Sequence, residues 1–214
     1  KLMIGFNRRF DNEFRKVKTS INNGEIGNPH IVKITSRDPS PPPVEYIKNS
    51  GGLFLDMTIH DFDMARFIVD KEIDEIYVKG EALIDQEIQK VWDIDTAVVL
   101  MKYVDSTIAV IDNSRKSAYG YDQRMEVFGS KGMIQANNVK VDNSKLYNQN
   151  GIISSLPMDF FLERYMEAYK IEIQDFVDSV INNRGVSVTG IDGLKSLQIG
   201  LAAKKSLLEN RPVK

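Results

Sequence analysis

The chain has 214 residues, of which 42% are hydrophobic and 27% charged, and this composition is typical of a folded domain rather than of a disordered chain. A formal net charge of −2 and a sequence pI near 5.8 give no general attraction to nucleic acid or to anionic membranes. The absence of cysteine excludes disulfides and thiolate metal sites and is compatible with a cytoplasmic location. We therefore expect one domain that binds neither nucleic acid nor a membrane.

The chain opens on residues 1–7, whose apolar pattern predicts a buried strand. This run has no initiator Met, no capping residue and no preceding turn, so we expect a cut through a larger protein. Asp11 then predicts the N-cap of a helix through residue 22, because its carboxylate can accept the first free amides. A strand is expected over residues 30–37, and the proline-rich run 38–43 is expected to be a stiff loop.

The middle of the chain predicts a sheet. Five short apolar runs are expected to be antiparallel strands, namely 75–84, 94–104, 107–114, 122–129 and 133–137. In the second run both alternating sets of residues are largely apolar, whereas a sheet with one wet face alternates apolar and polar residues. One face can pack on the chain's own helices, and the other is then free to pack on another subunit. We expect an α+β fold, an open predominantly antiparallel sheet with helices on one face, and a homo-oligomer, dimer or tetramer, through the open face.

The final third predicts two helices, separated from the sheet by a polar, irregular stretch at residues 138–157. They are expected at 165–182 and 190–209. Each has an apolar stripe at helical spacing, formed in the first helix by Tyr169, Ile173, Phe176 and Val180 and in the second by Leu194, Leu197, Leu201 and Leu208.

The most unusual polar cluster lies in residues 51–67, where five ionisable groups interrupt an apolar run. If residues 53–69 form one helix, Asp56 and His60 lie one turn apart, about 40° around the axis. A carboxylate beside an imidazole fixes its tautomer and raises its basicity, which is how a general base for a hydroxyl proton is built. The glycines at 51 and 52 would let a ligand or another domain approach the backbone closely.

The same residues also have less specific interpretations. Asp56 and His60 could be a first-turn carboxylate and a structural histidine, or two ligands of a metal ion, which would need a third ligand. Arg8 could anchor a substrate or end a strand, and Asp38 is by default a turn residue. Tyr119 lies in a run that more often marks a turn into a strand. Spacing alone leaves these alternatives open.

A family resemblance favours the catalytic interpretation. Gly51-Gly52 followed by Asp56, His60, Asp63, Arg66 and Phe67 resembles the substrate-domain motif of the glucose-fructose oxidoreductase, inositol dehydrogenase and MocA family, and most of all its inositol 2-dehydrogenase branch. The resemblance covers nearly the whole chain. Residues 5–11 resemble the family's crossover from the last strand of the nucleotide-binding domain, and residues 24–29 its turn into the second domain. Residues 119–122 and 128–132 also recur in similar positions.

The resemblance implies that residues 1–214 are a C-terminal substrate-binding and oligomerisation domain of the dihydrodipicolinate reductase-like type. In it, residues 1–10 are the last strand and crossover from a nucleotide-binding domain. It further implies that His60 takes the proton from a substrate hydroxyl while the hydride leaves for NAD, and that Asp56 hydrogen-bonds the substrate and orients His60. The residues implied to line the polyol pocket are Arg8, Asp38, Thr58 and Tyr119. The implied substrate is a cyclic polyol or sugar, with myo-inositol first among them.

Two features of the family are absent from these 214 residues: the glycine-rich dinucleotide fingerprint and the Glu-Lys-Pro segment whose lysine completes the catalytic set. NAD is therefore expected to be bound mainly by an N-terminal domain outside this chain, and the fragment alone is expected to be inactive. No residue here is assigned to the cofactor, and no metal is expected. The alternatives are a non-catalytic oligomerisation or sugar-sensing module of the same fold and a metal-dependent lyase or hydrolase.

Overall fold

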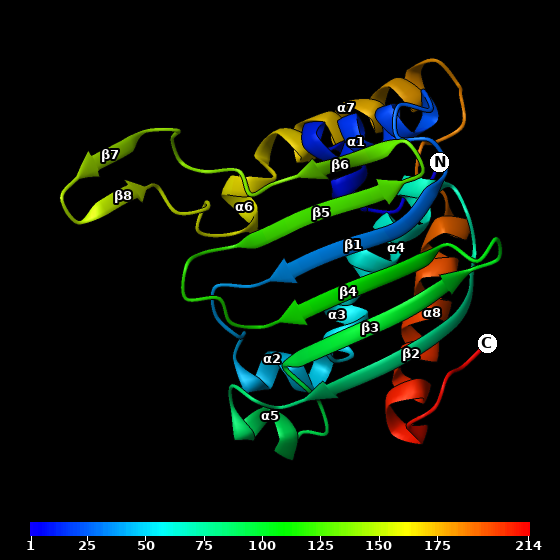
Figure 1. Ribbon diagram of the computed structural model, residues 1–214. Helices are drawn as coiled ribbons and strands as arrows, with labels where there is room; N and C mark the ends of the chain where they lie inside the picture. The colour runs from blue at the N-terminus through cyan, green and yellow to red at the C-terminus, as the bar shows by residue number, and fades with distance from the viewer.

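A six-stranded sheet forms the centre of the fold, and the computed structural model describes all residues from 1 to 214 (Figure 1). The strand order is β2-β3-β4-β1-β5-β6. β1 and β4 run parallel, and the other neighbouring pairs run antiparallel. The strands are β1 (Pro29–Arg37), β2 (Ile73–Glu81), β3 (Thr96–Tyr103), β4 (Ile108–Ser114), β5 (Asp122–Gly129) and β6 (Gly132–Ala136). The predicted α+β class and the predominantly antiparallel sheet are confirmed, with the strand expected near 30–37 as a central member.

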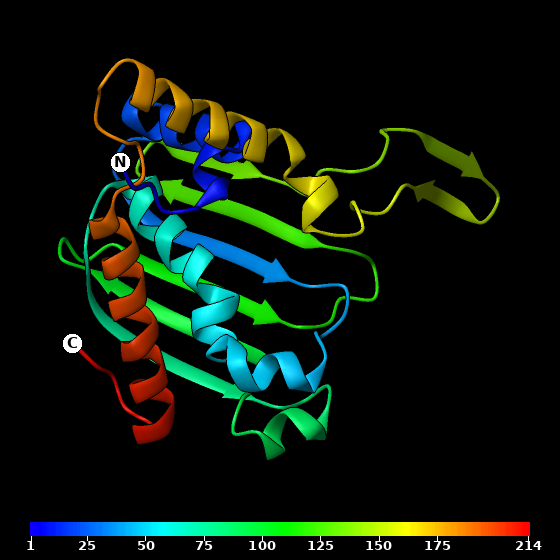
Figure 2. The same cartoon turned by 180° about the vertical axis from the view of Figure 1, so that it is seen from behind.

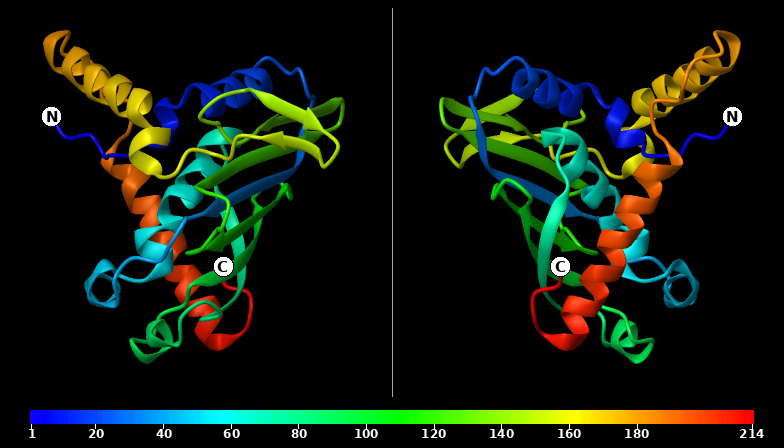
Figure 3. Two further views of the ribbon diagram at one scale, coloured as in Figure 1. Left: turned by 90° about the vertical axis from the view of Figure 1, so that its left-hand side faces the viewer. Right: turned by 90° about the vertical axis from the view of Figure 1, so that its right-hand side faces the viewer.

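The helices lie on one face of this sheet and leave the other face open, as the rear and side views show (Figures 2 and 3). They are the 3-10 helix η1 (Asn7–Phe10) and the α-helices α1 (Asn12–Asn22), α2 (Val44–Ser50), α3 (Leu53–Asp56), α4 (Thr58–Val69), α5 (Gln86–Lys90), α6 (Phe161–Arg164), α7 (Met166–Ile181) and α8 (Gly190–Glu209). None of them is both long enough and apolar enough to cross a membrane.

Local sequence signals explain where two of the helices begin. The Asp11 carboxylate accepts hydrogen bonds from the amides of Glu13 and Phe14, so the predicted N-cap of α1 is confirmed. Helix α8 begins with a reciprocal capping box between Thr189 and Asp192.

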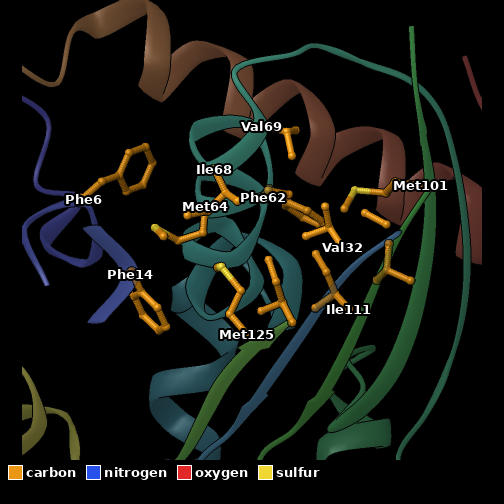
Figure 4. Packing of buried hydrophobic residues seen from close by; sticks show 14 of the residues in the cluster. Phe6, Phe14, Val32, Phe62, Met64, Ile68, Val69, Met101, Ile111 and Met125 are labelled. Carbon is orange, nitrogen blue, oxygen red and sulfur yellow. The ribbon is translucent and has the colours of Figure 1, made fainter. Parts of the chain in front are cut away.

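The hydrophobic core lies between the sheet and helix α4. Alternate residues of β3 are buried against the helices, in agreement with the period of two in a strand. Figure 4 shows Phe62 and Ile68 of α4 pointing into the space above Val32 of β1 and Ile111 of β4. All four side chains are fully buried, so α4 is a central helix whose position relative to β1 and β4 is fixed by packing.

The structure corrects two of the sequence predictions near the N-terminal half. Residues 1–6 form no strand, and Asn7–Phe10 form η1 instead. The helix expected over 53–69 is interrupted at Met57, whose backbone angles (φ −106°, ψ −58°) separate α3 from α4. At this break the Leu53 carbonyl accepts a hydrogen bond from the Met57 amide. The two helices therefore do not share one regular face.

The apolar stripes predicted for the last two helices do not face the core. In α7 the side chains of Ile173 and Val180 are exposed, whereas Glu172 and Ser179 are buried. In α8 the four striped leucines are at least partly exposed, and the buried residues are the small ones, Ser196, Gly200, Ala203 and Ser206. Small residues allow α8 to approach its neighbours closely, since a Cβ at Gly200 would lie 2.6 Å from Leu55.

The stretch expected to be irregular contains a hairpin. Strands β7 (Lys145–Asn148) and β8 (Gly151–Ser154) form a separate two-stranded sheet that projects away from the main body (Figure 1). All eight of its residues are exposed.

The contact between the β5–β6 turn and the segment before β1 can be tested with two glycines of the same turn. We expect Gly129→Ala to lower the free energy of unfolding by about 1–3 kcal/mol, because the new Cβ would lie 2.4 Å from the Ile26 carbonyl oxygen. Gly132→Ala in the same turn is the control, since nothing lies within 4 Å of a Cβ there, and its effect should stay within about 0.5 kcal/mol. Urea unfolding of the two variants measures the difference, and equal values would contradict the packing described.

Candidate active site

The predicted site residues gather at the edge of the sheet where β1 and β4 end. Parallel neighbours end at the same edge, so Asp38 follows β1 and Arg115 follows β4 at one place. The Asp38 amide donates a hydrogen bond of 2.9 Å to the Ser114 carbonyl. Helices α2, α3 and α4 follow one another on the helical side of the sheet, which faces the viewer in Figure 2.

His60 lies in the first turn of α4 and is partly buried. Its ring packs edge-to-face on Phe6, with centroids 5.7 Å apart, and its Nδ1 atom is buried without a hydrogen-bond partner. Burial, followed by the positive charge of Arg8, lowers the pKa of His60 to about 3. The imidazole is therefore neutral near pH 7.

Asp56 lies at the end of α3 and is held by two other residues. Its Oδ1 accepts a 2.7 Å hydrogen bond from the Tyr46 hydroxyl, and its Oδ2 lies 3.0 Å from Nη1 of Arg115. It makes no hydrogen bond to His60. The expectation that this carboxylate raises the basicity of the imidazole is therefore wrong for this structure. The physical reason is the break at Met57, together with two stronger donors that already occupy the carboxylate.

The two glycines before α3 are required by a carboxylate of the chain itself. Both have positive φ, 93° at Gly51 and 82° at Gly52, a region that other residues rarely adopt. A Cβ at Gly52 would lie 2.7 Å from Oδ1 of Asp93, and the Asp93 carboxylate accepts the Leu53 amide at 3.1 Å. In this structure the group that approaches the glycines is therefore Asp93, which caps α3, and not a ligand.

A buried polar network lies directly beneath the site. Arg8 forms an ion pair with Asp61 and also donates to Ser36 at 3.3 Å. The second Asp61 oxygen accepts a 2.9 Å hydrogen bond from the Asn113 amide, and Asn113 accepts one of 2.7 Å from the Thr58 hydroxyl. Thr58 is fully buried, so the structure places it under the site as a support rather than on a pocket wall. Arg8 is also buried, and it acts on the site through its charge.

Asp38 lies at the rim of the site, partly buried and facing two guanidinium groups. Burial raises the pKa of Asp38 to about 6, although the charges of Arg115 and Arg8 act in the opposite direction. Carboxylates of Asp56 and Asp61 add to the increase. Asp38 is thus the one predicted pocket residue whose ionisation changes close to neutral pH.

Tyr119 lies at the same end of the sheet, where β5 begins beside the end of β1. Its hydroxyl accepts a 3.0 Å hydrogen bond from Arg37 and donates one of 2.6 Å to Asp122. The side chain is 38% exposed, so its ring remains accessible while its hydroxyl is already occupied.

Comparison with known proteins identifies the architecture. The profile described as the GFO/IDH/MocA C-terminal domain matches residues 14–135, more than half of the chain. The chain belongs to this family. The myo-inositol 2-dehydrogenase of Thermotoga maritima is 52% identical over 213 residues, which cover 100% of this chain and 64% of that protein.

Two solved structures agree with the GFO/IDH/MocA assignment. The crystal structure of a probable dehydrogenase from Thermotoga maritima matches 100% of this chain with a TM-score of 0.98 at 52% identity. A Lactobacillus casei scyllo-inositol dehydrogenase with bound NAD(H) and scyllo-inositol matches 100% of the chain with a TM-score of 0.91 at 34% identity. The chain spans 64% of the length of each of these chains.

Several residues of this GFO/IDH/MocA site were not predicted from the sequence: Tyr46, Asp93, Asn113 and Arg115. One signal was present, because Asn113 occupies an inward position of β4, two residues after the buried Ile111, where an apolar residue is expected. Tyr46 lies in the short helix α2, Asp93 follows α5 and Arg115 follows β4. Their partners lie in other elements, so they carried no local signal.

No group of three or more His, Asp or Glu side chains in the domain is arranged to hold a metal ion. A pocket of about 490 Å³ lies elsewhere, beside the α1–β1 and β5–β6 turns, and contains none of the predicted site residues.

The raised pKa of Asp38 predicts a pH-dependent effect on stability. Because its folded value, about 6, exceeds its ordinary value of 3.8, the folded state binds more protons between these values, and stability falls as pH rises through this window. We expect Asp38→Asn to raise the free energy of unfolding at pH 7 by about 1–3 kcal/mol and to have little effect near pH 4.

Urea unfolding at both pH values measures this change. Asp142 is a control of opposite sign, because hydrogen bonds from Ser144 and Ser155 lower its pKa to about 2. Its stabilisation is present at pH 7 and is lost as pH falls, so Asp142→Asn should not stabilise the protein. A loss of stability in Asp38→Asn at pH 7 would contradict the assignment.

Proposed function

We propose that this chain is the substrate side of an NAD-dependent dehydrogenase that oxidises a secondary hydroxyl of a cyclic polyol, with myo-inositol as the first candidate. The observation that carries the proposal is a neutral, partly buried His60 with an unpartnered ring nitrogen, in the first turn of the helix that follows Asp56. The names of the similar proteins support the substrate class, since they include myo-inositol and scyllo-inositol dehydrogenases.

In the proposed reaction the neutral imidazole of His60 accepts the proton of the substrate hydroxyl as the carbonyl forms. A bound NAD would supply the hydride acceptor that this two-electron oxidation of the alcohol needs. The Asp56 carboxylate accepts a hydrogen bond from a substrate hydroxyl and holds the ring in register with His60. A fixed position of these two groups lowers the entropy cost of reaching the transition state.

The remaining predicted residues have graded roles in this proposal. Asp38, at the rim, accepts hydrogen bonds from polyol hydroxyls, and Tyr119 offers its accessible ring beside them. Arg8 and Thr58 act from below through the buried network, where Arg8 supplies charge and Thr58 fixes Asn113. We infer that NAD is bound mainly by a nucleotide-binding domain outside these 214 residues. The isolated chain is then expected to be inactive, and the cytoplasm remains the expected compartment.

Replacement of His60 tests the proposed base. In the full-length protein that carries this chain, His60→Ala should lower kcat for NAD-dependent oxidation of myo-inositol by roughly 10²-fold or more. His30→Ala is the matched control, because His30 is exposed at the start of β1 and packs on Phe128 instead. Reduction of NAD, followed by absorbance, measures both variants. A His60→Ala enzyme with unchanged kcat would reject the role of His60 as base.

A non-catalytic oligomerisation or sugar-sensing module of the same fold is the alternative, and one surface favours self-association in either case. The side chains on the open face of the sheet include several exposed apolar ones. A strand surface that faces water usually carries polar side chains at these positions. They are Val98, Leu100, Ile108, Phe128 and Met133, each 44–51% exposed. We infer that a second copy of the chain covers this face in a homodimer or tetramer.

A charge placed on the open face should therefore weaken assembly. We expect Leu100→Lys to shift the protein toward a smaller species, because an ammonium group buried between two sheets has no partner. Light scattering after size-exclusion chromatography measures the mass. Leu208→Lys is the control, since Leu208 is 84% exposed at the end of α8, on the helical side. An unchanged mass in Leu100→Lys, or an equal shift in both variants, would contradict this interface.

A further inference from the structure

The carboxylate of Asp56 is fixed by neighbours that are remote in sequence. Helix α3 has only four residues, and so short a helix cannot hold a side chain by its own stability. Tyr46 precedes Asp56 by ten residues in the sequence, and Arg115 follows it by fifty-nine. They lie 2.7 and 3.0 Å from its carboxylate oxygens. Each occupies a different oxygen of the carboxylate.

Arg115 connects both ends of α3. Its side chain is 1% exposed, and its second terminal nitrogen lies 3.9 Å from Asp93, which caps the Leu53 amide. A planar guanidinium can face two carboxylates at fixed angles, which the compact ammonium of lysine cannot do. The Nε and Nη2 atoms of Arg115 are buried without hydrogen-bond partners, so its ion pairs with Asp56 and Asp93 are the contacts that fix the guanidinium. The geometry ties the position of Asp56 to the end of β4.

Tyr46 provides the second contact from α2. This helix follows the three prolines at 41–43, whose fixed φ limits the positions that α2 can take. The Tyr46 side chain is 52% exposed, and its hydroxyl donates to Oδ1 of Asp56. The hydrogen bond to Asp56 raises the pKa of Tyr46, so the hydroxyl remains a donor across the neutral range.

We propose that Arg115 and Tyr46 are positioning residues that hold the Asp56 carboxylate for a substrate hydroxyl, so that Asp56 acts on the polyol and not on His60. This inference rests on the proposed function. Each carboxylate oxygen has about two lone-pair positions, so the Tyr46 hydrogen bond and the Arg115 ion pair leave room for hydroxyl groups of a substrate. His60 is oriented separately, by the edge of Phe6.

Tyr46→Phe is the most direct test, because it removes one exposed oxygen and keeps the ring. In the full-length protein we expect KM for myo-inositol to rise about 3–10-fold with kcat within about 2-fold, since the lost contact holds a group that binds the substrate before and during the reaction. Tyr77→Phe removes a comparable hydroxyl contact, from the edge strand β2 to Asn210 at the end of α8, and should change neither constant. A fall in kcat alone, or no change in KM, would overturn the proposal.

Arg115→Lys keeps the positive charge but removes the planar guanidinium group, and we expect kcat/KM to fall about 10–100-fold. Because this residue is buried, the variant is compared with Arg164→Lys, which breaks another buried arginine–carboxylate pair, with Asp11. Both should lose stability in urea, but only Arg115→Lys should raise KM. Equal effects on KM would assign Arg115 a structural role only.

A double-mutant cycle separates this inference from the proposed function. Tyr46→Phe, Asp56→Ala and the double variant are compared by urea unfolding, which needs no substrate. The proposal expects the two changes to be non-additive, because both remove the same hydrogen bond; additive changes would overturn it. If the wild-type protein oxidises no polyol but the cycle is non-additive, the proposed function fails while the contact that fixes Asp56 stands.

Discussion

The buried ion pair between Arg8 and Asp61 is the interaction on which the rest of the site depends. It joins η1 to α4, and through Asn113 it joins both to β4. A buried ion pair is stable only when its remaining hydrogen-bonding positions are occupied, and here Ser36 and Asn113 occupy them. Removal of either partner would leave an unpaired charge under the site, so the network fixes where α4 crosses the sheet.

The same network sets the electrostatics of the surface above it. The charge of Arg8 lowers the pKa of His60 and opposes the increase in the pKa of Asp38, so one buried guanidinium influences both the base and the rim carboxylate. Arg115 adds a second positive charge beside Asp38, Asp56 and Asp93. Two buried arginines thus hold several carboxylates close together, which would otherwise repel one another.

Local signals in the sequence predicted several helices and strands correctly. The order of the strands and the contacts of the site could not be predicted, because they depend on residues distant in the chain. The Asp11 cap and the strand near 94–104 follow from residues adjacent in the chain. The insertion of β1 between β4 and β5 depends on pairing across more than 70 residues, which periodicity does not encode. Periodicity also identified the stripe of leucines in α8 correctly but could not tell which surface covers it. Small residues such as Gly200 proved to be the ones that face the core.

The spacing of Asp56 and His60 is instructive for the same reason. Helical geometry fixes the angle between two side chains, but it says nothing about distant donors that compete for them, and Tyr46 and Arg115 occupy the carboxylate first. His60 is left in a dry position beside a positive charge, with a pKa of about 3. A general base is most effective when its pKa lies near the working pH. For His60 to meet this condition, an acceptor has to reach its unpartnered Nδ1, because a hydrogen bond there would stabilise the protonated ring.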